Sequence, residues 1–388
     1  MPVEKINIDQ FLELAKHHPV IDVRSPGEYN HAHIPGAFSL PLFTDTERAE
    51  VGTAYKQKSR ELAIKIGLDF FGPKMRKMVE EAEAIRNREF GIKNKEPGTL
   101  NEELEIKDAS KFPTPDSKLL IYCWRGGMRS GAVSWLLDLY GFKIYTLVGG
   151  YKKYRNHVLD SFKKLLQLKI LGGYTGSGKT YTLKELERRG EKIIDLEDLA
   201  NHKGSAFGNI GLPQQPTQEM FENLLAAKLS MIDDSWQMPD TDNRYPPTNI
   251  WVEDESQRIG LVNIPTGFWK TMRTAPVYFL DIPFEERLKH LVTEYGNLDK
   301  QKMIDAMSRI KDRLGGLETK NAITYLESNN TIESFRILLK YYDKWYLKGL
   351  HNREGINSLL TKINCDSVTP ENANRLHSHP ILHETSET

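Results

Sequence analysis

Residues 167–180 read QLKILGGYTGSGKT, and this stretch decides the fold of the C-terminal half of the chain. The apolar run 167–171 predicts a buried strand. Residues 173–180 match the pattern G-x-x-x-x-G-K-[ST] at every defined position. Glycines at this spacing bring backbone amides against phosphate oxygens at the start of a helix. The order strand, loop, helix therefore predicts a phosphate-binding loop.

The predicted phosphate contacts lie in one continuous run: Gly173, Tyr174, Thr175, Gly176, Ser177, Gly178, Lys179 and Thr180. Lys179 is expected to reach the outer phosphate oxygens, and Thr180 is the candidate ligand for a Mg²⁺ ion. Candidate acidic partners follow two later apolar runs at Asp195, Glu253 and Asp254, although a solvated turn is the alternative for the last two. The pattern predicts phosphate binding. It does not require that the bound diphosphate belong to ATP or to any other nucleotide.

A second loop, CWRGGMRS at residues 123–130, follows another short apolar run, 118–122. A cysteine between a strand and a helix N-terminus lies in a positive field, which lowers the thiol pKa and favours a thiolate nucleophile. We therefore assign catalytic roles to Cys123, Arg125 and Arg129. The rest of the loop, Gly126, Gly127, Met128 and Ser130, is expected to complete an anion pocket. The alternative is a buried, inert cysteine.

Both loops belong to alternating apolar runs and helical stretches, which predict an α/β fold with parallel sheets. Strands are expected at 20–23, 118–122 and 143–148 in a first domain, residues 1–157, with a charged helical insertion at about 45–115. A second domain, residues 158–370, continues with strands at 192–195, 249–252 and 276–280. From about residue 299 onward the pattern predicts mostly helix. Residues 371–388 are rich in polar residues and are expected to form a flexible tail.

The composition of the chain excludes several classes of protein. No apolar run is long enough to cross a membrane, and the N-terminus lacks an apolar signal core, so we expect a cytoplasmic protein without membrane contact. The two cysteines, Cys123 and Cys365, imply no disulfide framework, and no cysteine–histidine spacing indicates a structural metal. The formal net charge of 0 gives no global sign of nucleic-acid binding, so any such binding must use a local surface.

Three kinds of local surface are candidates for such contacts. Basic residues cluster at 152–155 and between 302 and 313, and aromatic residues cluster at 341–346. Solvated helix faces and a core-facing aromatic stripe are the plainer interpretations of these clusters. The glycine-rich run 201–211 is expected to form a loop that faces the phosphate site, and its Phe207 and Ile210, with Leu212, are candidates for an apolar groove.

The first domain resembles the rhodanese-like family. The resemblance covers residues 21–29, IDVRSPGEY, residues 33–37, HIPGA, the cysteine loop, and residues 147–151, LVGGY. In that family the cysteine carries sulfur or selenium. Cys123 to Arg129 makes a seven-residue loop, one residue longer than a typical sulfurtransferase loop. The resemblance therefore implies a larger, phosphate-bearing donor such as selenophosphate.

The cysteine loop, the phosphate loop and the GSAFG run at 204–208, in this order, resemble the tRNA 2-selenouridine synthase family. The resemblance implies a rhodanese-like α/β domain joined to a P-loop NTPase-like α/β domain with a helical tail. It implies conversion of the wobble 2-thiouridine of tRNA to 2-selenouridine by way of S-geranylation. Selenophosphate and geranyl diphosphate would be co-substrates, Mg²⁺ would assist, and ATP is not required. Partners would be tRNA and a selenophosphate-supplying enzyme.

Three other functions stay open on the residues alone. A phosphatase–kinase-like fusion would use Cys123 on a phosphate ester through its Cys-x5-Arg loop, and it would need a general acid nearby. A nucleotide-gated binding module would use the cysteine as a redox sensor. An ordinary sulfurtransferase would thiolate tRNA with ATP and would need no selenophosphate.

Overall fold

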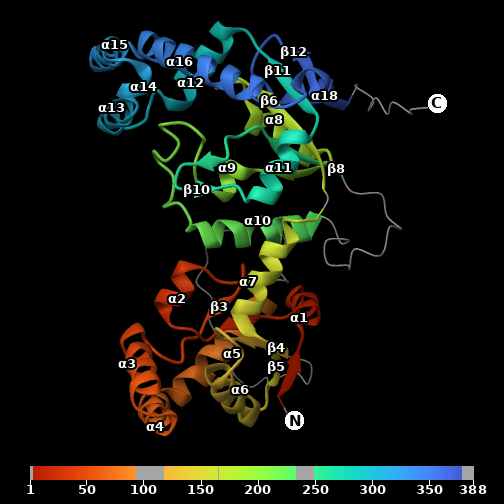
Figure 1. Cartoon of the computed structure of the whole chain (residues 1–388), viewed down its shortest axis with the longest axis vertical. Helices are drawn as coiled ribbons and strands as arrows, with labels where there is room; N and C mark the ends of the chain where they lie inside the picture. Colours follow the sequence, from red (N-terminus) through yellow and green to blue (C-terminus); the bar gives the residue numbers. More distant parts are fainter. Residues whose placement is uncertain (1–2, 93–117, 165, 233–248, 378–388) are drawn as a thin grey trace, which may run out of the picture. The chain divides into compact units, whose positions relative to one another are not determined.

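The computed structural model describes residues 3–92, 118–164, 166–232 and 249–377. The chain divides into two units, residues 1–160 and residues 161–388, which we call unit 1 and unit 2. The sequence predicted this boundary at residue 157, and it falls slightly later, near the end of α7 (Gly150–Ser161). Each unit contains its own parallel five-stranded sheet (Figure 1). The predicted α/β class is therefore confirmed.

In the order β1–β5–β4–β2–β3 the strands of unit 1 are Glu4–Ile6, Lys143–Leu147, Lys118–Tyr122, Val20–Asp22 and Phe38–Ser39. Three of them, β2, β4 and β5, form at the apolar runs expected from the sequence, whereas the short strands β1 and β3 were not predicted. The central strand β4 places Ile121 opposite Ile21 of β2 and Leu120 opposite Tyr145 of β5. Helices α1 (Ile8–Ala15), α2 (Pro26–His31) and α6 (Met128–Tyr140) connect the strands. Both faces of a parallel sheet are covered, which explains the unbroken apolar runs.

The predicted helical insertion is part of the core of unit 1. It forms α3 (Asp45–Gln57), α4 (Arg60–Phe71), a short 3₁₀ helix (Gly72–Lys74) and α5 (Met75–Ile92), drawn in orange in Figure 1. Residues 93–115 of the predicted insertion lie outside the described residues. At helical spacing, α5 buries Met78, Ala82 and Ile85 in the same apolar cluster as β4 and α6. The insertion therefore stabilises the sheet that carries Cys123.

A buried ion pair fixes the carboxyl end of β2. Asp22 and Arg24 are 0% and 1% exposed, and the Arg24 Nη2 lies 2.6 Å from Asp22 Oδ2. The same Arg24 group donates to the carbonyl of Ala32 at 2.6 Å, and its guanidinium lies 3.8 Å from the ring centre of Tyr151. Burial alone would lower the pKa of Arg24, but the contact with Asp22 outweighs burial and raises it. Arg24 therefore stays charged.

Unit 2 has the sheet order β12–β11–β6–β8–β7, with all neighbours parallel. The strands in that order are Leu360–Asn364, Val277–Asp281, Gln167–Gly173, Asn249–Glu253 and Lys192–Ile194. The hairpin strands β9 (Arg258–Ile259) and β10 (Val262–Asn263) form a separate two-stranded sheet. The central strand β6 leads directly into the phosphate loop and α8 (Lys179–Arg188). This is the order that the sequence predicted.

The end of the chain differs from its prediction in two ways. Leu360–Asn364 forms the edge strand β12 inside the region predicted to be mostly helical, because Ile363 packs into the core beside β11. Residues 371–377 were assigned to a flexible tail. They instead complete a 3₁₀ helix (Pro370–Asn372) and form α18 (Ala373–His377), with Ala373 and Leu376 buried in the same core. The rest of the predicted tail, residues 378–388, lies outside the described residues.

A helical group forms its own apolar cluster at one end of unit 2 (Figure 1). It comprises α12 (Phe284–Tyr295), α13 (Lys300–Arg309), α14 (Lys311–Leu314), α15 (Gly316–Glu327) and α16 (Thr331–His351). Four further helices cover the sheet or follow the group: α9 (Leu196–Leu199), α10 (Gln218–Ile232), α11 (Thr266–Thr274) and α17 (Ile356–Leu359). No helix among the described residues has the length and apolar character needed to cross a membrane.

Replacing Arg24 with Ala should lower the free energy of unfolding of unit 1 by about 3–5 kcal/mol, because Asp22 would remain buried and unpaired. Arg76→Ala is the matched control, since Arg76 forms an exposed pair with Glu80 and should change stability by at most about 0.5 kcal/mol. Hydrogen-exchange mass spectrometry of unit 1 peptides in urea would measure both. Equal, small losses in the two variants would contradict a stabilising role for the buried pair.

Candidate active site

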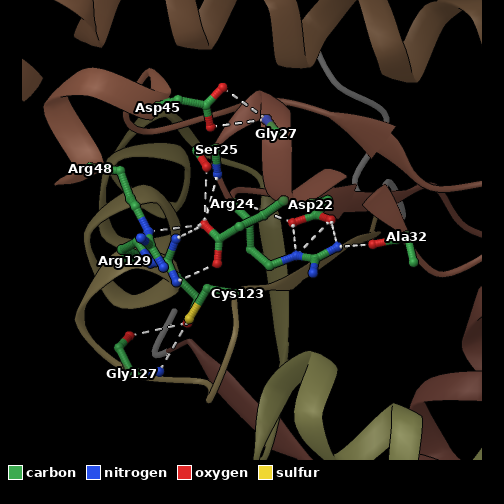
Figure 2. A network of polar contacts seen from close by, with 12 residues as sticks. Asp22, Arg24, Ser25, Gly27, Ala32, Asp45, Arg48, Cys123, Gly127 and Arg129 are labelled. Atoms are coloured by element: carbon green, nitrogen blue, oxygen red, sulfur yellow. Dashed lines mark hydrogen bonds and ion pairs between the residues drawn. The ribbon is translucent and has the colours of Figure 1, made fainter. Parts of the chain in front are cut away.

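Cys123 lies at the carboxyl end of β4, where its loop turns into α6. Its Sγ accepts a hydrogen bond from the amide of Gly127 at 3.3 Å and lies 3.2 Å from Ser130 Oγ (Figure 2). The cysteine is 3% exposed. The helix that follows begins at Met128, so its first amides face the sulfur region. The sequence-predicted loop residues Cys123, Gly127 and Ser130 therefore come together around one sulfur atom.

These contacts change the acidity of the thiol. Burial alone raises the pKa of Cys123, because it disfavours the thiolate. Hydrogen bonding by the Ser130 hydroxyl and by the amides of Ser130, Gly127 and Arg125 outweighs burial, so the pKa lies below its ordinary value. A thiolate held by several donors is a nucleophile and also a tolerable leaving group.

The turn after Cys123 requires glycine at one position. Gly126 has φ +65°, and a Cβ there would lie 2.6 Å from the carbonyl oxygen of Leu147. The loop is thus pressed against the end of β5, and the amide of Tyr151 donates to the Cys123 carbonyl at 2.8 Å. This close approach explains why LVGGY and the cysteine loop occur together in the sequence.

Arg129, predicted to close the anion pocket, is held by a carboxylate that the sequence analysis did not assign to the site. Its Nη1 and Nη2 lie 2.6 and 3.3 Å from the two carboxylate oxygens of Glu28. Arg48 of the insertion approaches the same carboxylate, with Nε 3.7 Å from Oε2 (Figure 2). Burial alone raises the pKa of Glu28, but the contacts with Arg129 outweigh it and lower the pKa. Glu28 is therefore ionised at neutral pH.

The remaining predicted residues of this loop are open to solvent. Arg125 and Met128 are exposed, and Trp124 between the cysteine and Arg125 is also exposed. Asp45 at the start of α3 accepts from the Gly27 amide at 3.0 and 3.1 Å, which fixes the insertion against α2. The insertion thereby brings Arg48 to the cysteine loop, a role that the sequence pattern did not indicate.

The phosphate loop of unit 2 has the predicted strand–loop–helix geometry. Gly178 precedes the first residue of α8 with φ +72°, a conformation that glycine adopts without strain. Lys179 Nζ donates to the Gly173 carbonyl at 3.1 Å, so its side chain folds back over the loop. The buried Ser177 Oγ finds no hydrogen-bond partner among the described residues.

Helices α12 and α16 hold the backbone of this loop. The Tyr346 hydroxyl accepts from the Gly173 amide at 3.1 Å. Arg287 donates to the Thr175 carbonyl at 3.1 Å and to both oxygens of Asp343 at 2.9 and 2.8 Å. The Arg287 guanidinium also lies 4.7 Å from the ring centre of Tyr174, so this predicted loop residue serves as an anchor.

Asp254 was a candidate metal ligand, but both of its oxygens have protein partners. Arg353 Nη2 lies 2.6 Å from Oδ1, and the Tyr346 hydroxyl donates to Oδ2 at 2.8 Å. Arg353 is 2% exposed. A buried arginine pair of this kind removes the carboxylate from ligand binding and fixes it as a support for the phosphate loop.

A cavity of about 850 Å³ opens beside the phosphate loop. Its lining contains the polar groups of Lys179, Thr180, Glu197 and Glu255. It also contains aromatic and apolar side chains, which we call the aromatic wall and which are Trp269, Leu291, Tyr295, Tyr342, Trp345 and Leu350. Its volume falls within the range of small-molecule sites. The cavity therefore suits a ligand with an anionic head and an apolar body.

The carboxyl groups beside the cavity share their protons. Burial and then the charge of Glu255 raise the pKa of Glu197 to about 9, although the charge of Lys179 acts in the opposite direction. Burial likewise raises the pKa of Glu255. The two carboxyl groups are hydrogen-bonded to each other, and both would lie within 2.7 Å of a Cβ placed on Gly204. No sequence motif indicated that Glu197 belongs to the site.

The predicted acids Asp195 and Glu253 lie next to this pair. Asp195 caps α9 by accepting from the Asp198 amide at 2.8 Å, and Glu253 accepts from the Glu197 amide at 2.8 Å. Burial raises the pKa of both carboxyl groups. One oxygen of each is buried without a hydrogen-bond donor among the described residues. Among the residues that the structure describes, no group of three or more Asp, Glu, His or Cys side chains is arranged to hold a metal ion.

The glycine-rich run 201–211 borders the cavity, as the sequence predicted, through Asn201, Lys203, Gly204 and Ser205. Leu212 lines the same cavity. Phe207 lines a small apolar pocket, together with Leu338 and Tyr342, while Ile210 packs into the helical core. Of the three residues proposed for an apolar groove, Leu212 therefore lines the cavity, Phe207 lines only the small pocket, and Ile210 lines neither.

The aromatic cluster at 341–346 contributes mainly to this site. The Tyr342 hydroxyl accepts a hydrogen bond from the Ala206 amide at 3.1 Å, and the Tyr346 hydroxyl supports the phosphate loop. Both tyrosines therefore hold backbone in place and also line the cavity. Trp345 is 43% exposed at the cavity edge. The basic clusters at 152–155 and 302–313 do not line the cavity.

Alkylation by iodoacetamide should modify Cys123 in preference to Cys365. Both thiols are buried, but burial raises the pKa of Cys365, whereas hydrogen bonds lower that of Cys123. The rate at Cys123 should rise with pH, with a midpoint below the ordinary pKa of a free thiol, and then level off. Peptide mass spectrometry over a pH series would measure the rate at each thiol. Ser130→Ala should shift the midpoint to higher pH, and an unchanged midpoint would contradict the role of this hydroxyl.

Comparisons with known proteins agree with the geometry of the two units. The family model described as the tRNA 2-selenouridine synthase AAA domain matches residues 166–369, and that of the rhodanese-like domain matches residues 7–67. A tRNA 2-selenouridine synthase of Bdellovibrio bacteriovorus is 31% identical over 91% of this chain and 94% of its own length.

Two further relatives with the same name span similar lengths. The protein of Sulfurovum is 32% identical over 84% of this chain and 87% of its own length. That of Nitrosomonas europaea is 30% identical over 86% and 90%, respectively. Matches of this extent cover both loops and both units. The chain therefore belongs to the tRNA 2-selenouridine synthase family.

Proposed function

We propose that this enzyme replaces the sulfur of the wobble 2-thiouridine in tRNA with selenium, by way of an S-geranylated base. The cavity of unit 2 carries the proposal, because it combines a phosphate loop with an aromatic, apolar wall. Neither ATP nor an adenylate is needed to explain that combination. The family name supports tRNA as the substrate, and the two anion-binding loops support two phosphate-bearing co-substrates.

In the proposed first step, geranyl diphosphate binds in unit 2. Its diphosphate lies against the amides of residues 173–180, and Lys179 neutralises the charge that develops as the diphosphate leaves. The ten-carbon chain lies along the aromatic wall, near Trp345 and Tyr342. The thiocarbonyl sulfur of the base takes the geranyl group and becomes part of a better leaving group.

A Mg²⁺ ion fits this step as an aid to diphosphate departure. Thr180 would bind it together with diphosphate oxygens and water, a mode that requires few protein ligands. The carboxyl groups of Glu197 and Glu255 line the same cavity and would neutralise its charge, releasing their shared proton. When bound, the ion supplies positive charge to the leaving group. Asp254 takes no part, since Arg353 and Tyr346 occupy both of its oxygens.

In the proposed second step, selenophosphate acts at or near Cys123. Its phosphate fits the amides around Sγ and the arginines Arg129 and Arg48, which are shared with Glu28. The selenium displaces geranylthiol from carbon 2 of the base. Cys123 serves either as a nucleophile or as a selenium carrier. A selenophosphate-supplying enzyme is the natural partner for this unit, because the donor must be made by another protein.

The proposal is tested by mass spectrometry of nucleosides from thiolated tRNA, incubated with the protein and geranyl diphosphate and then with selenophosphate. Wild type should form a geranylated base that converts to 2-selenouridine. Lys179→Ala should lower geranylation on the order of 100-fold or more, because it removes a charge that stabilises the transition state. Lys192→Ala, which changes an exposed lysine at the start of β7, is the matched control.

Two results would contradict the proposal. Wild type that leaves the thiolated base unchanged under all of these conditions would exclude both steps. An ATP-dependent change of the base, without need for selenophosphate, would favour the sulfurtransferase alternative.

A further inference from the structure

We propose that Cys123 attacks phosphorus, and that unit 1 removes a phosphoryl group from a selenium atom already bound to the base. This inference rests on the proposed function and assigns the chemical step performed by the cysteine. When the selenium of selenophosphate displaces geranylthiol, the phosphoryl group stays attached to it. The product is a base with a carbon–selenium–phosphorus linkage, and cleavage of the selenium–phosphorus bond must follow to give 2-selenouridine.

The balance of electrons favours phosphorus as the point of attack. If the Cys123 thiolate took a neutral selenium atom from selenophosphate, phosphorus would leave as phosphite, and phosphate would form only with an added oxidant. Attack on phosphorus needs none. The sulfur–phosphorus bond forms, the selenium–phosphorus bond breaks, and the electron pair leaves with selenium as the 2-selenouridine anion. Water then cleaves the sulfur–phosphorus bond, giving inorganic phosphate, a proton and the thiolate.

The atoms around Cys123 suit both halves of this reaction. The Gly127 amide donates to Sγ at 3.3 Å, and the amides of Arg125 and Ser130 add to the lowering of the thiol pKa, so backbone donors lie where a transferred phosphoryl group would sit. Cys123 to Arg129 has the Cys-x5-Arg spacing, one residue longer than a six-residue loop, and this length is the sequence feature that favours a phosphoryl group over a single chalcogen atom. Such positioned donors stabilise the charge on the equatorial oxygens in the transition state.

Ser130 is placed to assist the second half. Its hydroxyl lies 3.2 Å from Sγ and 3.1 Å from the Gly127 carbonyl, and the residue is 2% exposed. The hydroxyl has one proton. It donates that proton to Gly127 when the sulfur is a thiol or is bonded to phosphorus, and to the sulfur when the thiolate forms. Breakdown of the phosphocysteine regenerates the thiolate, so the hydroxyl stabilises the leaving sulfur.

The surrounding carboxylates explain which phosphoryl groups the loop can remove. Asp22 is paired with Arg24, Asp45 accepts from the Gly27 amide, and Glu28 is paired with Arg129 (Figure 2). None of the three is in position to donate a proton. An alkoxide leaving group needs a general acid, whereas a selenium anion delocalised into the base does not. Within the described residues, these three carboxylates therefore give no support to cleavage of ordinary phosphate esters, whereas removal of a selenium-bound phosphoryl group needs no such acid.

Glu28 holds the arginines until the substrate arrives. The pair is partly accessible, with side chains 22% and 17% exposed for Arg129 and Glu28, and Arg48 is 53% exposed. A phosphoryl group carries more charge than one carboxylate and competes with Glu28 for both arginines. The helical insertion thus contributes Arg48 as a positioning residue for the phosphoryl group.

The experiment supplies the full-length protein with S-geranylated tRNA and selenophosphate, followed by acid quench and mass spectrometry of nucleosides and of Cys123 peptides. Cys123→Ala should form the selenium-phosphorylated base but release its phosphate on the order of 100-fold more slowly than wild type. Geranylation of thiolated tRNA by the same variant should be unchanged, which shows that it is folded. Ser130→Ala should accumulate a phosphoryl group on Cys123. Ser134→Ala, one turn along α6, is the matched control and should accumulate none.

Other outcomes would overturn the inference. Cys123→Ala that stops at the geranylated base would mean that the cysteine delivers selenium. Cys123→Ala that makes 2-selenouridine at the wild-type rate would mean that it has no essential role. In both of these cases wild type still converts the base, so the proposed function stands. Wild type that converts neither thiolated nor geranylated tRNA would overturn the proposed function and this inference together.

Discussion

Buried arginine–carboxylate pairs hold both anion-binding loops in shape. In unit 2, Arg353 fixes Asp254, and Asp254 fixes the Tyr346 hydroxyl that binds the first amide of the phosphate loop. In unit 1, Arg24 pairs with Asp22 and lies over Tyr151, whose amide binds the Cys123 carbonyl. A loop that cradles an anion must direct its amides inward before the ligand arrives. In unit 2 this order uses one donor of the loop, because the Gly173 amide donates to the Tyr346 hydroxyl, whereas in unit 1 the Gly127 amide still donates to the sulfur.

The two loops differ in what stands beside them, and this difference separates their chemistry. The cysteine loop places a sulfur nucleophile among amides and beside two arginines that share Glu28. The phosphate loop has a lysine, a group of proton-sharing carboxyls and an aromatic wall. The cysteine loop is suited to a reaction at the bound anion itself. The phosphate loop is suited to holding a diphosphate while the apolar part of the same ligand reacts.

Both loops and most strands could be predicted from the sequence because their signals are local. Glycine spacing, an apolar run and a following helix lie within about 15 residues of one another. The supporting residues could not be predicted, since Glu28 meets Arg129 and Asp254 meets Arg353 across 101 and 99 residues. Asp254 followed a strand, as a metal ligand does, and only the fold shows its arginine partner. The strand β12 was missed because it has only five residues, some of which are polar. It is defined by its pairing with β11 and not by an apolar run.

We propose that the phosphate loop serves geranyl transfer alone, while the cysteine loop completes selenation. This separation is tested by supplying Lys179→Ala with tRNA that already carries the S-geranyl group, together with selenophosphate, and measuring 2-selenouridine by mass spectrometry of nucleosides. We expect the variant to form 2-selenouridine at the wild-type rate from this substrate. Failure of the variant on geranylated tRNA, where wild type succeeds, would contradict the separation of the two steps.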